Sequence, residues 1–336
     1  MKEAVPAASS VPAPRRPFPL LQEACIAVVA LACLFLLDDN LSLLTNIAAM
    51  CILALSLNFI LGQAGIASMG HAALFGAGGY GAGLFALHVS GSPLSGLLVG
   101  ACAGAAVALA SGALLLRARG LTLVMLTIAT AQLLFELVNW QRDITGGDDG
   151  LTSFTISPLL GRFEFDFIGR TGYLYAVAVL LVVSVALRLL VNSPFGLTSR
   201  AIRLDASRVE TMGGRVYLHL LAVYVIGGAV AGVAGALMVQ TTSVASLSML
   251  DFNLSASVLI MVVLGGIQRP AGAILGTITY MAIHHVASGL SPHHWLFVIG
   301  VLLIAVMVAL PGGLLELWDR AVARTWGRRA RAHHAG

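Results

Sequence analysis

A succession of long apolar runs dominates this chain, and their lengths fix what it can fold into. An α-helix needs about 20 apolar residues to cross the hydrocarbon core of a bilayer. The predicted spans lie at 20–37, 41–61, 71–89, 94–116, 121–140, 173–191, 216–240, 253–267, 271–289 and 295–311. The eighth span is short, and its neighbour at 241–252 is a candidate for a re-entrant or interfacial helix.

The amino-acid composition is typical of an integral membrane protein. Apolar residues make up 58% of the sequence and charged residues only 10%, whereas soluble domains carry roughly 25% charged residues. The first apolar run ends in Asp38 and Asp39 without a small-x-small cleavage site, so we interpret it as a retained span rather than a signal peptide. The predicted fold class is an all-α integral membrane protein with about ten transmembrane helices.

The basic residues are placed unevenly along this series of spans. With the N-terminus inside, all of the 19 Lys and Arg residues except Arg142, Arg162 and Arg170 fall on the cytoplasmic side. Cytoplasmic loops of membrane proteins carry such an excess of positive charge. We therefore expect a multi-pass membrane protein with both termini in the cytoplasm. The long outer loop, 141–172, is then polar, acidic and rich in glycine.

This topology divides the chain into three parts. They are a flexible cytoplasmic leader at 1–19, a transmembrane domain at 20–314 and a basic cytoplasmic tail at 315–336. Inside the transmembrane domain, 193–215 is the only long cationic segment between two apolar blocks. Gly213 and Gly214 are expected to end a helix of about 198–212 within it. We interpret the segment as a handle for another protein, and the alternative is a solvated loop whose arginines fix orientation.

A second unusual segment, 62–83, is rich in glycine. Glycines in membrane helices allow close packing of backbones, and they also permit an unwound stretch that lines a cavity. Both interpretations stay open for any single glycine. The polar neighbours of these glycines favour a passage for substrate. The candidate passage residues are Gln63, His71, Gly76, Gly79 and Tyr80.

Several function classes lack the residues that they require. A P-loop needs a Gly-rich turn followed by Lys, and the one lysine is Lys2. Ion-coupled carriers usually keep ionisable residues at mid-depth, but Glu23, Glu136 and Arg188 lie near span ends. The histidine pairs at 284–285 and 293–294 have no Cys, Asp or Glu at ligand spacing, so we expect no metal site. The sequence therefore predicts no enzyme activity and an external source of energy.

Four stretches of this sequence resemble one known family. They are LSLNFILGQAGIASMGHAALFGAGGY at 55–80, TGGDDGLTSF at 145–154, the loop and span at 193–237, and MVVLGGIQRPAGAILG at 261–276. Together they resemble the permease subunits of branched-chain amino acid ABC importers, specifically the LivM type. The resemblance runs from about residue 45 to 314, which is most of the chain.

The resemblance implies a binding-protein-dependent importer of a bacterial inner membrane, with several partners. These would be a second permease subunit of the LivH type, two cytoplasmic ATPase subunits that use ATP and Mg²⁺, and a periplasmic substrate-binding protein. No cofactor is expected on this chain itself. The residues expected to couple the chain to the ATPases are Arg200, Arg203, Asp205, Arg208, Glu210 and Gly213. Asp148 and Asp149 are expected to dock the binding protein, with a solvated turn as the alternative.

The substrate is the most open part of this prediction. Branched-chain or related amino acids are expected, but members of the family also handle urea, amides or aromatic acids. A different class, an autonomous secondary carrier or channel, is the remaining alternative, and the missing mid-membrane charges argue against it.

Overall fold

The computed structural model describes residues 40–152, 154, 156–157, 170–267, 269–290, 300 and 314. The elements follow in the order α2 (Leu41–Phe59), η2 (Ile60–Ala64), α3 (His71–His88), α4 (Pro93–Leu115), α5 (Leu121–Trp140), α6 (Arg142–Thr145), η3 (Gly147–Asp149), α7 (Arg170–Asn192), α8 (Pro194–Leu204), α9 (Ala206–Thr211), α10 (Val216–Thr242), η4 (Leu247–Leu250), α11 (Phe252–Gly265) and α12 (Pro270–Leu290). Over this part of the chain there is no strand, only an isolated bridge between Leu151 and Ala245. The all-α prediction is confirmed.

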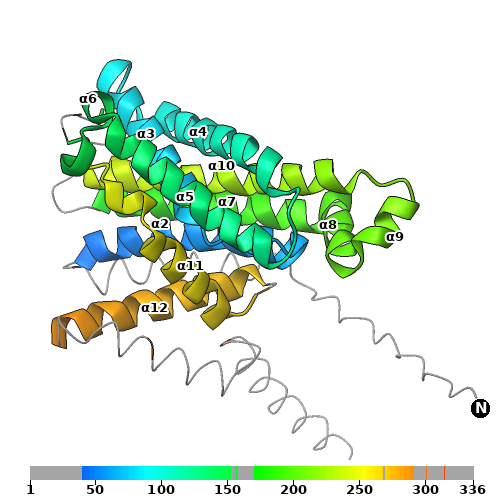
Figure 1. Ribbon diagram of the computed structural model, residues 1–336. Coiled ribbons are helices and arrows are strands. Elements are labelled where there is room, and N and C mark those ends of the chain that lie inside the picture. The colour runs from blue at the N-terminus through cyan, green and yellow to red at the C-terminus, as the bar shows by residue number, and fades with distance from the viewer. Residues whose placement is uncertain are drawn as a thin grey trace, which may run out of the picture.

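The long helices run side by side, with α8 and α9 at one end and α6 at the other (Figure 1). Helices α2 and α10 are central: α10 packs against α2, α3 and α4, while α2 also packs against α7, α11 and α12. Their uninterrupted apolar sequences explain this position, because a helix that is hydrophobic all round is buried among others. Helix α5 lies at the edge, against α3, α4, α11 and η4.

Within the described residues, five helical segments are long and apolar enough to cross a membrane alone. They are Leu41–Ala64, Pro93–Leu115, Leu121–Trp140, Arg170–Asn192 and Val216–Thr242. A sixth is obtained if α11 and α12 are counted as one broken span. The spans predicted at 71–89, 253–267 and 271–289 are helices, but the number of crossings stays a prediction. The leader, the spans at 20–37 and 295–311 and the tail lie outside the described residues, apart from residues 300 and 314.

Helix ends follow simple local rules. Pro93 and Pro194 stand in the first turns of α4 and α8, where proline loses no hydrogen bond because those N–H groups have no partner inside the helix. Asp251 caps α11 by accepting a hydrogen bond from the backbone N–H of Asn253 at 3.3 Å. The predicted helix near 241–252 is reduced to the four-residue turn η4, because α10 continues to Thr242.

One predicted element is wrong. The single helix expected at 198–212 is two helices, α8 and α9, with Asp205 in extended conformation between them. The Asp205 side chain accepts a hydrogen bond from the backbone N–H of Arg208 at 3.2 Å, which starts a new helix. Aspartate favours such caps over helix interiors because its carboxylate competes for backbone donors.

Glycines bring α3, α4 and α10 together with their backbones in contact. A Cβ added at Gly78 of α3 would overlap the backbone of Gly232 on α10, and one at Gly235 would overlap the carbonyl oxygen of Phe75 on α3. A Cβ at Gly104 of α4 would overlap the carbonyl oxygen of Gly228 on α10. Small residues permit such close approach in membranes. We call these residues, Gly78, Gly104, Gly228, Gly232 and Gly235, the glycine seam.

Candidate coupling and passage sites

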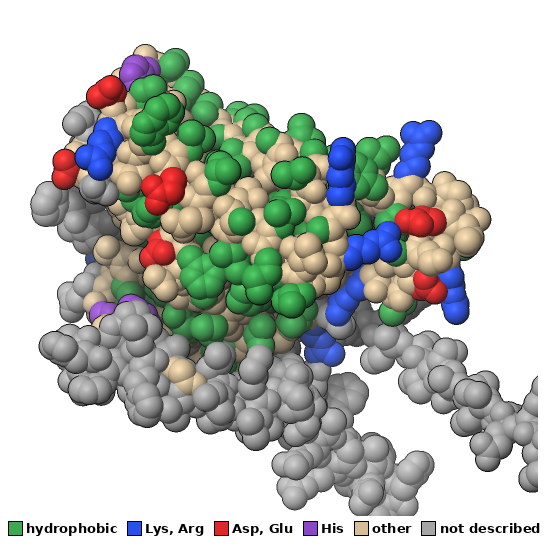
Figure 2. Space-filling model, viewed as in Figure 1, with side chains coloured by type: hydrophobic (Ala, Val, Ile, Leu, Met, Phe, Trp, Pro, Cys, Tyr) green, Lys and Arg blue, Asp and Glu red, His purple; other side chains and the backbone are tan. Residues whose placement is uncertain are grey.

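The candidate coupling residues lie on α8 and α9, which project from the basic end of the molecule. Figure 2 shows most of the visible Lys and Arg side chains around these helices, while the end around α6 carries mainly acidic ones. Arg200 is held at the junction with α7, because its guanidinium donates to the carbonyl oxygens of Val191 at 2.7 Å and Gly196 at 3.3 Å. It therefore satisfies the Val191 carbonyl oxygen at the end of α7 and ties it to the first turn of α8.

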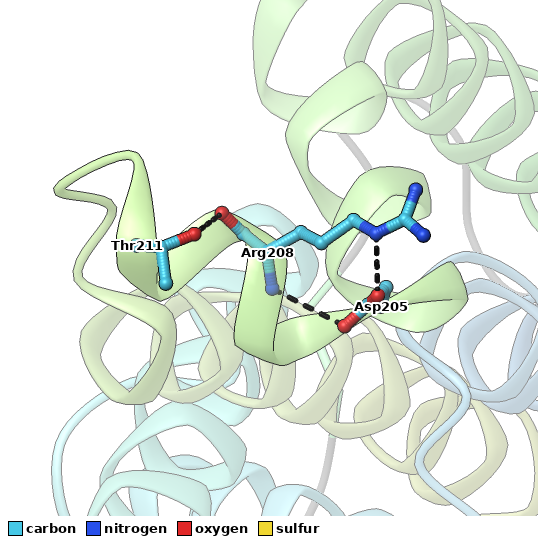
Figure 3. A network of polar contacts seen from close by, with 3 residues as sticks. All are labelled: Asp205, Arg208 and Thr211. Atoms are coloured by element: carbon cyan, nitrogen blue, oxygen red, sulfur yellow. Dashed lines mark hydrogen bonds and ion pairs between the residues drawn. The ribbon is translucent and has the colours of Figure 1, made fainter.

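Asp205, Arg208 and Thr211 form a local polar network on α9 (Figure 3). Besides capping the helix, the Asp205 carboxylate lies 2.9 Å from Nε of Arg208, and the Thr211 hydroxyl donates to the Arg208 carbonyl oxygen at 2.8 Å. The Arg208 side chain remains 85% exposed, so this ion pair contributes about 0–1 kcal/mol. The network orders α9 and leaves the guanidinium accessible.

Glu210 lies on α9, and Gly213 lies in the turn between α9 and α10. Glu210 lies 3.6 Å from Arg119, which belongs to the turn between α4 and α5. Gly213 has a φ of +86°, where only glycine is unstrained, and it reverses the chain toward α10. The predicted coupling residues are thus brought together on one short projection.

Arg203 makes the contact that sequence reasoning missed. Its guanidinium donates to the carbonyl oxygen of Gly62 on η2, 141 positions away in the chain. Its aliphatic stem also covers Gly65, where an added Cβ would lie 3.1 Å from Cγ of Arg203. Gly65 has a φ of +71°, so a side chain there would be strained as well as crowded. No spacing or motif in the sequence pairs these positions.

The projection also exposes large apolar side chains. Leu204 is 87% exposed and Met212 85% exposed, and α9 buries none of its own residues. An open cavity of about 350 Å³ lies beneath α8 and α9, against the first turns of α10. Exposed apolar groups rimmed by charges are typical of a protein-binding surface.

Helix α8 is nevertheless firmly attached to α10. The Ser199 hydroxyl lies 2.9 Å from Nε2 of His219, and the rings of Phe195 and His219 pack with centroids 4.4 Å apart. Ile202 is buried below them. Helix α8 is therefore attached to α10 as well as to η2.

The predicted passage segment begins with a distorted turn of helix. Residues Ile60–Ala64 form a π-helix, and no regular helix follows until His71. Gln63 is buried on this turn, and its Oε1 has no hydrogen-bond partner among the described residues. Distorted turns of this kind often mark functional positions in helices.

His71 serves the packing of three helices. Its Nε2 lies 2.8 Å from the Ser56 hydroxyl on α2, and Ser56 donates to the Gly227 carbonyl oxygen on α10 at 2.7 Å. Because the Ser56 hydrogen is used for Gly227, His71 donates from Nε2 and leaves Nδ1 as an acceptor. That Nδ1 is buried and lacks a partner in the described chain.

Gly76 and Gly79 lie against η4. A Cβ at Gly76 would overlap the side chain of Leu250, and one at Gly79 would lie 2.7 Å from Cε of Met249. Tyr80 is buried, and its hydroxyl has no partner among the described residues. Of the five predicted passage residues, Gln63 lies on η2 and the other four lie on α3. The turn η4 covers Gly76 and Gly79. The role of the five residues in transport stays a prediction.

The acidic outer turn is built on glycines. Gly146 and Gly150 adopt φ values of +76° and +69°, and they bracket η3, which contains Asp148 and Asp149. The backbone of Leu151 then pairs with Ala245 through hydrogen bonds of 2.8 and 3.0 Å, which fixes the turn to the linker after α10. Asp149 is exposed, and the side chain of Asp148 lies outside the described part. Within the described residues no group of three or more His, Cys, Asp or Glu side chains is arranged to hold a metal ion.

Comparison with known proteins places most of the chain in one family. Residues 40–307 match the family described as branched-chain amino acid transport system, permease component. The chain is 28% identical over 296 residues to the high-affinity branched-chain amino acid transport system permease protein LivM of Escherichia coli (strain K12), which covers 79% of this chain and 67% of that protein. It is 28% identical over 323 residues to the protein of the same name from Salmonella typhimurium (strain LT2), with 87% and 74% covered. No solved structure matches the chain.

Proposed function

The chain belongs to the family of branched-chain amino acid transport permease components, and we propose that it is the LivM-type membrane subunit of an ATP-driven, binding-protein-dependent importer. It is a multi-pass membrane protein and a transporter component rather than an enzyme. The family match over residues 40–307 carries this proposal. Branched-chain or related amino acids are the proposed cargo.

We propose that both termini and the α8–α9 projection face the cytoplasm of the cell that carries this protein in its inner membrane. The concentration of basic residues at that end supports this orientation. Cysteines introduced at the exposed position Asp149 and at Gly336 test it in intact spheroplasts. An impermeant thiol reagent should label the cysteine at 149, and labelling at 336 alone would show the opposite topology.

The proposed partners follow from the missing P-loop and from the exposed apolar and charged residues of α8 and α9. ATP and Mg²⁺ would be used by two separate ATPase subunits, since the one lysine of this sequence, Lys2, is not in a P-loop. The exposed Leu204 and Met212, beside Arg208 and Glu210, would seat α9 on an ATPase. A LivH-type second permease would complete the membrane part. The outer turn with Asp148 and Asp149 would meet the periplasmic binding protein.

Arg203 would link ATP hydrolysis to the passage. Its hydrogen bond to Gly62 joins the ATPase-facing helix α8 to η2, which leads directly into α3. A shift of α8 would thus pull on the segment that carries Gln63 and then on the helix that carries His71, Gly76, Gly79 and Tyr80. Only the contact between Arg203 and Gly62 in this connection is non-covalent, because η2 continues along the chain into α3.

The passage itself would open on the side of α3 that η4 covers. Side-chain ends of Met249 and Leu250 are what Gly79 and Gly76 meet there, and a four-residue turn is easier to displace than a long helix. Small residues would leave a weakly binding route, which suits a protein whose ligand was already selected by a binding protein.

Reconstitution tests the proposed function directly. The permease pair, the ATPases and the binding protein are placed in proteoliposomes, and uptake of labelled leucine, isoleucine and valine is compared with that of urea, an amide and an aromatic acid. Uptake of the branched amino acids that requires ATP and the binding protein is expected. Uptake without the ATPases would indicate an autonomous carrier or channel, and preference for another panel member would reassign the cargo.

A further inference from the structure

The outward faces of three peripheral spans differ in polarity. On α4 the exposed residues between the helix ends are all apolar, for example Leu98, Cys102 and Ala106. The same holds on α7 between residues 171 and 191. On α5 the exposed stripe instead includes Gln132 and Glu136.

The two polar residues on α5 lie on one stripe opposite its packed face. Gln132 and Glu136 are four positions apart, with Nε2 of Gln132 3.4 Å from Oε1 of Glu136. The other side of the helix is packed through Thr127, whose hydroxyl accepts a hydrogen bond from the backbone N–H of Met69 at 3.2 Å, and through Ala131. Rotation of the helix to hide the polar pair would therefore break an existing interface.

Both residues lie at least one helical turn inside the span, which is deeper than the span-end position expected for Glu136 from the sequence. At about 1.5 Å per residue, Glu136 is about 6 Å and Gln132 about 12 Å from the end of α5 at Trp140. Ionisable groups inside membrane spans are rare and face a protein interior or a water-filled cavity. Glutamate also has a shorter stem than lysine or arginine, so it has less reach to the headgroup region.

We propose that this stripe of α5 lines a water-filled passage between the two permease subunits, and that the carboxylate of Glu136 holds the ammonium group of the amino acid in transit. The inference rests on the proposed function. The amide of Gln132 would face the carboxylate of the same ligand, and the flanking apolar positions Met125, Leu133 and Leu137 would contact its branched side chain. One carboxylate, one amide and an apolar surface complement the ammonium, the carboxylate and the side chain of a branched-chain amino acid.

The position of α5 agrees with this assignment. The helix packs against η4, which covers the glycines of α3. The stripe lies on the opposite face of α5 from η4, so a displacement of η4 would shift the helix that carries the stripe. A charge pair formed in a wet passage is weak, and weak binding is what a route that must release its ligand requires.

Labelling tests whether the stripe meets water or lipid. Glu136→Cys is made in a chain that keeps Cys102 on α4 as an internal control, while Cys25, Cys33 and Cys51 are replaced by alanine. In the assembled complex a water-soluble, membrane-impermeant thiosulfonate should modify position 136 from outside and leave Cys102 unmodified. Equal protection of both positions would show that α5 faces lipid and would overturn the proposal.

Uptake tests the charge. Glu136→Gln should lower ATP-dependent leucine uptake by about tenfold, because a charge-assisted contact is replaced by a neutral one. Glu136→Asp, which keeps the charge, should stay within about threefold of wild type. Subunit assembly, melting temperature and ATP hydrolysis stimulated by the binding protein should not change in either variant.

Three results would contradict the ammonium contact. Wild-type uptake by Glu136→Gln would remove the need for the charge, and loss of the second permease from the purified complex would make the residue a packing contact. Loss of uptake in Glu136→Asp would show that the negative charge alone does not support transport. If the wild-type complex moves no amino acid, the proposed function fails, whereas the labelling result still decides whether the stripe is wet.

Discussion

The two faces of α3 (His71–His88) make different kinds of contact. On one face Gly78 meets the backbone of Gly232, within the glycine seam. On the other, Gly76 meets the side chain of Leu250 on the short turn η4, and Gly79 meets Met249 of η4 beside Val239 and the Gly235 carbonyl oxygen of α10. Backbone contacts between long helices cannot be rearranged without separating the helices, whereas side-chain ends can move. The comparison assigns rigid assembly to one face and motion to the other.

The largest expected effect is on the rigid face. Gly235→Ala places a methyl group on the carbonyl oxygen of Phe75 and should cost about 1–3 kcal/mol through overpacking. The melting temperature of the purified complex and the yield of assembled subunits should both fall. Gly83→Ala is the matched control, because its nearest neighbours would lie at 3.6 Å. Equal behaviour of the two variants would remove the distinction between packed and open glycine positions.

A substitution at the α8 end of the molecule should impair transport without affecting the glycine seam. Arg203→Ala removes the hydrogen bond to Gly62 without touching the glycine seam. We expect normal assembly and about tenfold less uptake per ATP hydrolysed, which corresponds to about 1.4 kcal/mol of lost coupling. Arg117→Ala, which removes an exposed arginine from the turn between α4 and α5 outside the coupling residues, is the control for lost positive charge. Wild-type coupling in Arg203→Ala would disprove the link.

A smaller effect is expected on the movable face. Gly79→Ala brings a methyl group to within 2.7 Å of Cε of Met249, the far end of a flexible side chain, while Cγ2 of Val239 and the Gly235 carbonyl oxygen lie at 3.1 and 3.3 Å. Since methionine adapts to irregular space, the cost should be less than about 1 kcal/mol. Gly78→Ala, one position away but facing Gly232, should be clearly more destabilising by thermal melting. The reverse order would contradict the comparison.

The helices were predictable because their signal is local. The run at 121–140 matches α5 residue for residue, and the ends of α4 and α10 differ from prediction by one or two positions. The family resemblance was carried by glycine-rich and loop motifs and agrees with the family match at residues 40–307. The lengths of the apolar runs and the order of the motifs can be read from the sequence without knowledge of any tertiary contact.

The contacts that position the candidate sites were not predictable. The break at Asp205 depends on whether a carboxylate caps a new helix or extends into solvent, and both fit the sequence. The bond from Arg203 to Gly62 joins positions 141 apart. The cover of Gly76 by Leu250 depends on the path of a linker with no strong pattern of its own. Each of these is decided by packing rather than by propensity.

A reversible crosslink between α3 and η4 tests the central claim most directly. Because a Cβ at Gly76 would overlap Cγ of Leu250 and a Cβ–Cγ bond is about 1.5 Å, cysteines at the two positions would have Cβ atoms less than about 4 Å apart. This separation suits a disulfide. The pair is built in a chain whose four native cysteines are replaced, and Leu250→Cys alone is the control.

The oxidised Gly76→Cys, Leu250→Cys complex should hydrolyse ATP but take up no leucine, and a reductant should restore uptake. This result is expected if the passage opens only when η4 leaves α3. Uptake at the wild-type rate, with the disulfide verified by mass spectrometry, would show that the route lies elsewhere.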